Sequence, residues 1–133
     1  MPNKSLRILI ADAQHFNRLR IERLFNQLGY FRVAPVQSLD ELLALVEYGC
    51  EPLDLVLVNG AMAIGALDLF SFLDDNPQVH HGFIFNERQA PLSPVAGKVR
   101  LSRAALPDLA SITQLMSAVD RRLPLVGTVI SVR

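Results

Sequence analysis

One apolar run near the middle of the chain limits the folds that the sequence can adopt. Residues 53–58 are apolar except for Asp54, and the run ends at Asn59, which a glycine follows. An apolar run of strand length that lacks polar alternation is typical of a strand covered on both faces of a parallel sheet. The sequence therefore predicts a buried, central strand with Asn59 at its carboxyl end.

Strand-like and helical patterns alternate along the rest of the chain. Further strands are predicted at residues 6–11, 31–36, 82–85 and 98–101, and Pro35 belongs on a sheet edge or at a strand end. Helical stripes are predicted from about residue 14 to 28, and at 39–48, 67–73 and 107–123. A capping box from Ser38 to Glu41 marks the second helix, Pro107 marks the start of the last, and residues 60–62 are expected to form a loop.

The alternation predicts an α/β fold, a doubly wound five-stranded parallel sheet with helices on both faces, because right-handed crossovers place helices on both sides. Prolines and glycine between the fourth and fifth strands leave the fourth helix short or missing. We expect residues 1–123 to form one domain. Residues 124–133 are β-prone and are expected to be an extra strand, a loose tail or a linker.

Size and charge exclude several classes of function. The chain has 133 residues, half of them apolar, which is enough for one core, and its 13 basic residues balance 13 acidic ones. No net field therefore draws it to nucleic acid or to an anionic membrane. Cys50 is the single cysteine, which excludes an internal disulfide, and we expect it to be packed. With no signal peptide or membrane span predicted, we expect a cytoplasmic protein.

Polar residues follow the predicted strands at the edge where parallel sheets collect functional groups. The four segments are Asp12-Ala13-Gln14, Asn59-Gly60-Ala61, Asn86-Glu87 and Ser102-Arg103. On the first helix, Arg18, Arg20 and Arg23 are interpreted as a solvated face.

The order and lengths of these segments resemble the receiver domain of two-component response regulators, which has a flavodoxin-like fold of five strands and five helices. The resemblance covers residues 6 to about 123. It is best in residues 7–12 with 16–18 after them, and in residues 54–59 followed by Met62.

The resemblance implies a phosphorylation site, and this chain matches only one of its key side chains. Asp12 matches the first of an acidic pair, while Ala13 replaces the second, the direct magnesium ligand. Asn59 replaces the aspartate that accepts phosphate. Asn86 replaces the hydroxyl residue, and Ser102 replaces the lysine, with Lys98 the only lysine nearby.

These replacements predict a degenerate phospho-acceptor pocket. Its members are Asp12, Ala13, Asn59, Asn86 and Ser102, with Gln14, Gly60, Ala61, Glu87 and Arg103 at the periphery. Mg²⁺ is normally held by one or two carboxylates plus phosphate oxygens, and an aspartyl phosphate requires an anionic oxygen nucleophile. We therefore expect no metal site, no cofactor and no catalytic residue.

The chain is interpreted as a pseudo-receiver, a signal-transduction regulator that is not phosphorylated. We expect it to act as a protein-protein interaction module, either by homodimerisation or by docking a partner protein, with no nucleic acid or membrane partner. The alternative is a flavodoxin-like domain that binds a small ligand or nucleotide through Gln14, Asn59, Gly60 and Asn86. An enzyme is not expected. The Asn59-Gly60 pair adds the hypothesis that slow deamidation regenerates a carboxylate.

Overall fold

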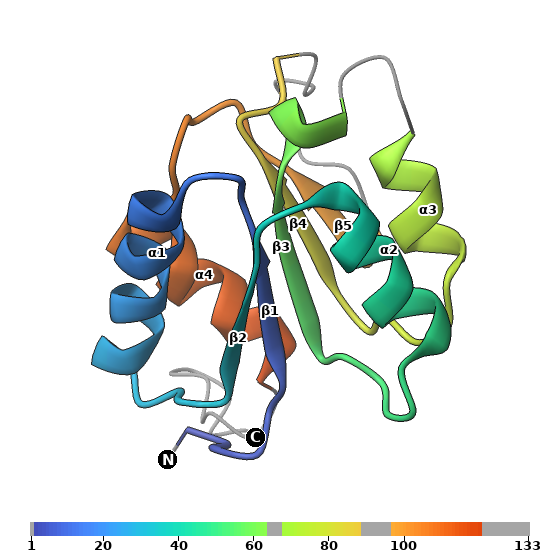
Figure 1. Cartoon of the computed structure of the whole chain (residues 1–133). Coiled ribbons are helices and arrows are strands. Elements are labelled where there is room, and N and C mark those ends of the chain that lie inside the picture. The colour runs from blue at the N-terminus through green and yellow to red at the C-terminus, as the bar shows by residue number, and fades with distance from the viewer. Residues whose placement is uncertain (1, 64–67, 89–96, 121–133) are drawn as a thin grey trace.

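The computed structural model describes residues 2–63, 68–88 and 97–120 (Figure 1). Its strands are β1 (Ile8–Ala11), β2 (Val33–Val36), β3 (Leu55–Asn59), β4 (Gly82–Phe85) and β5 (Val99–Leu101). Neighbouring strands pair in parallel in the order β2-β1-β3-β4-β5, so β3 is central, and β2, which contains Pro35, is an edge strand. The fold is the predicted flavodoxin-like, doubly wound parallel sheet.

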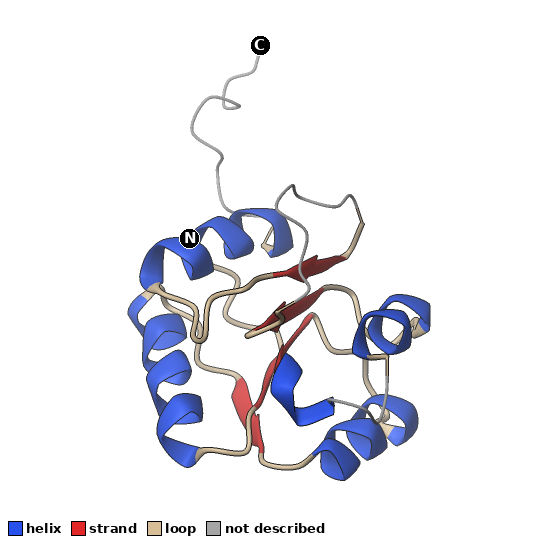
Figure 2. Cartoon of the chain, turned by 90° about the horizontal axis from the view of Figure 1, so that it is seen from above, coloured by secondary structure: helices blue, strands red, loops and turns tan. Residues whose placement is uncertain are grey.

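In the part of the chain that the structure describes, four α-helices cover the sheet: α1 (His15–Gln27), α2 (Leu39–Tyr48), α3 (Leu69–Asp75) and α4 (Leu109–Val119). Helices α1 and α4 lie on one face and α2 and α3 on the other, as the view from above shows (Figure 2). The segment expected to lack a regular helix, at residues 89–96, and the tail at 124–133 lie outside the described residues.

Alternation along β1 explains why the core has two halves. Ile8 and Ile10 pack against α1 and α4, whereas Leu9 and Ala11 pack against α2 and α3. All four side chains are buried, because successive residues of a strand point to opposite faces and both faces carry helices.

Three helices begin at a side-chain cap. Ser38 Oγ accepts a hydrogen bond from Glu41 N–H, as the predicted capping box requires, but Glu41 Oε1 accepts from Gln37 N–H, one residue before the cap. The caps of α3 and α4 are Asp68 and Asp108, which the sequence analysis did not identify. Both carboxylates accept from a backbone N–H three residues ahead, which satisfies a donor that the first turn leaves without a partner.

The structure corrects three local predictions. Pro107 precedes the Asp108 cap and does not start the last helix, because the aspartate oxygen caps the first turn better than the proline could. Residues 60–62 belong to a 3₁₀ helix, η1 (Gly60–Ala63), and not to a loop. Cys50 is exposed and not packed, because it follows the end of α2 at Gly49 and lies between the helix and the buried strand β3.

A buried polar pair joins distant parts of the chain. Tyr30 Oη donates to Asp120 Oδ2 at 2.7 Å, and Asn3 N–H donates to the same oxygen at 2.8 Å. Tyr30 and Asp120 are each 1% exposed. Burial, together with the bond to Asp120, raises the pKa of Tyr30 far above its ordinary range. Within the described residues, no helix has the length and hydropathy needed to cross a membrane.

Candidate functional site

Asp12 directly follows β1, at the edge of the sheet where the parallel strands end, and both oxygens of its carboxylate accept hydrogen bonds. Oδ1 accepts from Gln14 N–H at 2.8 Å, and Oδ2 accepts from the side-chain amides of Asn17 at 3.2 Å and Asn59 at 3.0 Å. The residue is 1% exposed. Three N–H donors therefore satisfy both oxygens of this buried carboxylate without an added cation.

Asn59 ends β3 and uses both atoms of its side-chain amide. Its Oδ1 accepts from Ala61 N–H at 2.9 Å, and because a backbone N–H can only donate, this contact fixes which amide atom is the oxygen. The amide Nδ2 must then face Asp12, to which it donates. Asn59 is therefore oriented by its neighbours on both sides.

Asn86, just after β4, is the third side chain of this hydrogen-bonded set. Its Nδ2 donates to Asn59 Oδ1 at 3.0 Å, and its backbone adopts a left-handed φ of 55°, a region that asparagine tolerates better than most residues. We call Asp12, Asn59 and Asn86 the edge network. It links the carboxyl ends of β1, β3 and β4 through two hydrogen bonds between side chains.

Gly60 allows the 3₁₀ helix to lie close to the end of β4. A Cβ atom at this position would lie 3.2 Å from Asn86 O and 3.3 Å from Phe85 O, which are backbone atoms with little freedom to move. The absence of a side chain therefore lets η1 lie close to the main chain of Phe85 and Asn86.

Arg18 corrects the interpretation of the first helix as having a fully solvated arginine face. Its Nη1 donates to the main-chain oxygen of Asp12 at 2.6 Å, and its Nε is buried without a hydrogen-bond partner. Arg20 and Arg23 are exposed, as predicted. The guanidinium of Arg18 holds the backbone of Asp12, while the carboxylate turns to the edge network.

The remaining predicted site residues differ in exposure and in their contacts. Ala13, Gln14, Ala61 and Arg103 are exposed, whereas Glu87 and Ser102 are half-buried. Ser102 accepts Glu87 N–H with its main-chain oxygen and Ala104 N–H with Oγ, so it fastens the end of β5 to the end of β4. Its side chain is neutral, so Ser102 does not supply the positive charge of a lysine.

Lys98 does not replace the lysine that Ser102 lacks. Its Nζ donates to the main-chain oxygens of Asn76 and Val79, each at 2.8 Å. Val79 pairs with Leu53 ahead of β3, at the amino ends of the strands. Lys98 is therefore fixed at the opposite edge of the sheet from Asp12.

The residues present do not fit Mg²⁺. Both Asp12 oxygens already accept N–H donors, Ala13 has no side-chain oxygen, and Asn59 turns its amide nitrogen toward Asp12. Across residues 2–63, 68–88 and 97–120, no group of three or more His, Cys, Asp and Glu residues is placed to hold a metal ion. A hard cation that prefers carboxylate and phosphate oxygens would have to break this network to bind.

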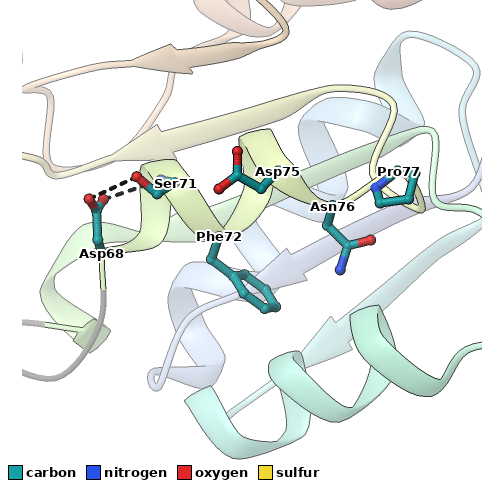
Figure 3. A pocket seen from close by; sticks show the side chains of 6 residues that line it. All are labelled: Asp68, Ser71, Phe72, Asp75, Asn76 and Pro77. Carbon is teal, nitrogen blue, oxygen red and sulfur yellow. Dashed lines mark hydrogen bonds between the residues drawn. The ribbon is translucent and has the colours of Figure 1, made fainter.

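A concavity of about 430 Å³ runs along α3, away from the edge network (Figure 3). Asp68 binds Ser71 at the helix start, through the two hydrogen bonds drawn as dashed lines. Those bonds, the one from Ser71 N–H foremost, hold the pKa of Asp68 below its ordinary value. Phe72 points toward α2 while Asp75 points away from it. The polar groups of this concavity do not converge on one point, so it is a weaker site than the edge network.

Asn17 is the site residue that sequence reasoning missed, and Arg18 is the one that it assigned to a solvated face. Both lie in the first turns of α1, five and six residues after Asp12, which is the signal that places them beside the end of β1. No protein-family model matches the chain, and no curated protein matches it significantly.

Proposed function

We propose that this chain is a receiver-like signalling domain that is not phosphorylated and acts by contact with another protein. The proposal rests on the fold, with strand order β2-β1-β3-β4-β5, and on the position of Asp12, Asn59 and Asn86 at the ends of β1, β3 and β4. Functional groups of such sheets collect at this edge.

The single observation that carries the proposal is the engagement of Asn59. Its amide nitrogen binds Asp12, and its amide oxygen accepts from both Asn86 and Ala61. A phospho-acceptor presents a free anionic oxygen, whereas this side chain is neutral and its atoms are already bound. Under this proposal the edge network joins β1, β3 and β4 permanently. The partner protein binds a surface whose conformation does not depend on phosphorylation.

The absence of a phosphorylation cycle is tested by exposing the protein to acetyl phosphate and Mg²⁺ and measuring its intact mass. We expect no phosphoryl adduct on the natural chain. The matched control restores the receiver pattern with Ala13→Asp, Asn59→Asp, Asn86→Thr and Ser102→Lys, and is expected to gain reactivity. A hydroxylamine-sensitive adduct on the natural chain would refute the proposal.

The interaction itself is tested by light scattering and by capture of partners on the immobilised chain. We expect either self-association or a captured protein, in the same amount with and without acetyl phosphate and Mg²⁺. A monomer that captures nothing would count against an interaction module, and a response to the phosphodonor would count against the unphosphorylated mode.

The alternative, a small ligand or nucleotide held at this edge, has less support. Its expected contacts, the amides of Asn59 and Asn86, hydrogen-bond to each other. Binding would have to replace those bonds, which would leave half-buried polar groups without partners unless the ligand reproduced each one. A thermal-shift screen with nucleotides, flavins and cyclic dinucleotides tests this alternative, and we expect no stabilisation.

A further inference from the structure

A pocket of about 370 Å³ lies at the other end of the sheet, where β1 and β2 begin beside the end of α2. Its apolar lining includes Leu9 and Leu53, which are buried, and Phe31 and Leu45, which are 59% and 43% exposed. Few large apolar side chains of the described residues are this exposed. The volume falls within the range of pockets that hold small ligands.

Two arginines border this pocket, and the strand register makes them neighbours. Ile8 of β1 pairs with Val33 of β2, so Arg7 and Arg32 stand opposite each other one residue earlier. Both line the pocket. Like charges at neighbouring positions of two paired strands are unfavourable, so an anion bound at this end of the sheet would offset them.

Only one carboxylate of the described chain compensates the two guanidinium groups. Glu51 Oε1 lies 3.4 Å from Arg7 Nη1, which also donates to Pro52 O. Arg32 Nη1 donates to Ser5 O at 3.3 Å, and within the described residues Arg32 has no acidic partner. The pocket therefore combines an apolar interior with one uncompensated guanidinium at its mouth.

We propose that this pocket binds a small organic carboxylate. The apolar body of the ligand lies against Leu9, Leu45 and Leu53, and its carboxylate binds Arg32, with Arg7 contributing to the field. A guanidinium presents paired N–H donors that match the two oxygens of a carboxylate. This site is separate from the edge network and does not depend on the receiver-like proposal.

The open edge of β2 favours a small molecule over a peptide that adds a strand. Arg32 O and Val36 O bind β1, so the alternate residues, Val33 and Pro35, turn their backbone groups outward. Proline has no N–H to offer, and the next outward donor, Gln37 N–H, binds Glu41. An added strand would find too few donors along this edge.

The test is a titration of the full chain with phenylbutyrate, in which binding is monitored by backbone amide NMR shifts. The comparison ligands are phenylbutanol and phenylbutylamine, which have the same apolar body but carry a neutral and a cationic head group, respectively. We expect phenylbutyrate to shift the amide signals of Ala34, Leu45 and Gly49. It should bind at least about tenfold more tightly than phenylbutanol, because a charge-assisted hydrogen bond contributes enough free energy for a tenfold change in affinity. The amine should bind most weakly.

Variants test separately how the charge of Arg32 and the apolar lining contribute to binding. Arg32→Gln should lower phenylbutyrate affinity to that of phenylbutanol, whereas Arg20→Gln, on the exposed surface of α1, should leave it unchanged. Leu45→Glu should abolish binding of both compounds. Arg32 and Leu45 are exposed enough for the variants to fold, which circular dichroism checks, and Ala34→Leu, which fills the pocket from an exposed position, gives a second route to the same loss.

Five results would overturn the proposal. Four are equal affinity for the acid and the alcohol, an Arg32→Gln variant that binds like the natural chain, shifts confined to other parts of the fold, and no binding at millimolar concentrations. The fifth comes from a Phe-Asp peptide with both ends blocked, so that its only carboxylate is a side chain. If it binds tenfold more tightly than phenylbutyrate and requires Arg32, the occupant is a protein segment and the small-molecule assignment is wrong.

Discussion

Asn59 Nδ2 lies 3.0 Å from Asp12 Oδ2, so a neutral amide donates to a buried carboxylate. The contact is attractive without a metal, because an amide N–H donates to an ionised acceptor. The same amide accepts from Asn86 and Ala61, which fixes its orientation. The side chains of the edge network therefore satisfy one another without a metal ion.

Asn59→Asp should destabilise the fold. The substitution replaces the donor to Asp12 with a second carboxylate at hydrogen-bond distance, and we expect a loss of about 1 to 3 kcal/mol in the free energy of unfolding at neutral pH. Like-charge repulsion raises the folded-state pKa of the pair, so the loss should shrink as the pH falls and one carboxyl group takes up a proton. Urea unfolding at several pH values measures both effects. A variant as stable as the natural chain at neutral pH would contradict the importance of the Asn59 donor.

Ala13→Asp combined with Asn59→Asp should create a response to Mg²⁺. Together with Asp12 the variant places three carboxylates at the end of β1 and β3, and a cation that binds only the native state raises its stability by mass action. We expect the urea midpoint of the double variant to rise in millimolar Mg²⁺, that of Asn59→Asp alone to rise less, and that of the natural chain to stay constant. An equal rise in all three would show that the ion acts elsewhere.

The two substitutions Asn86→Ala and Asn86→Gly should differ in stability. Both remove the hydrogen bond to Asn59, but only alanine adds strain at the left-handed φ of 55°. We expect Asn86→Ala to be about 1 kcal/mol less stable than Asn86→Gly. Chemical denaturation of the pair measures this difference, and alanine being equal to or better than glycine would mean that backbone strain at this position is negligible.

Several of these features follow from the sequence, and others require the folded chain. The bounds of β4 and the central place of β3 were predicted, and Pro35 was expected on a sheet edge or at a strand end, because apolar runs and proline restrict the backbone locally. The caps Asp68 and Asp108 were not, since a short polar side chain in a loop and one that caps a helix have the same sequence pattern. The amides of Asn59 and Asn86 were predicted at the site, but their mutual bond depends on side-chain orientation, which no local pattern encodes.

Tyr30→Phe should weaken the fold and change its response to alkali. Removing the hydroxyl deprives buried Asp120 of one donor, which should lower the free energy of unfolding by about 1 to 3 kcal/mol. Burial raises the pKa of Tyr30, so the native state keeps its proton where the unfolded chain, with a tyrosine pKa of about 10, loses it. The stability contributed by Tyr30 is therefore complete below that pH and declines above it.

The gap in stability between the natural chain and Tyr30→Phe should consequently narrow as the pH rises above about 10. Urea midpoints across this range measure the gap. Tyr48→Phe is the matched control, because its ring is 81% exposed and makes no contact like that of Tyr30 with Asp120. A constant gap at all pH values would contradict the assignment of the effect to the buried hydroxyl.

Asn59 should deamidate slowly in the folded protein, despite the glycine that follows it. The reaction requires the Gly60 nitrogen to attack the side-chain carbonyl carbon, with loss of ammonia, and the amide must rotate to allow it. Its oxygen is held by Ala61 N–H and Asn86, and its nitrogen by Asp12. Intact-mass analysis during storage should therefore show little gain in the folded chain and a faster gain in urea, while Asn86→Ala, which frees part of the amide, should lie between them. Equal rates in buffer and in urea would mean that the edge network does not restrain Asn59. Because the product carboxylate would face Asp12, the deamidated fraction should also unfold at lower urea than the intact fraction.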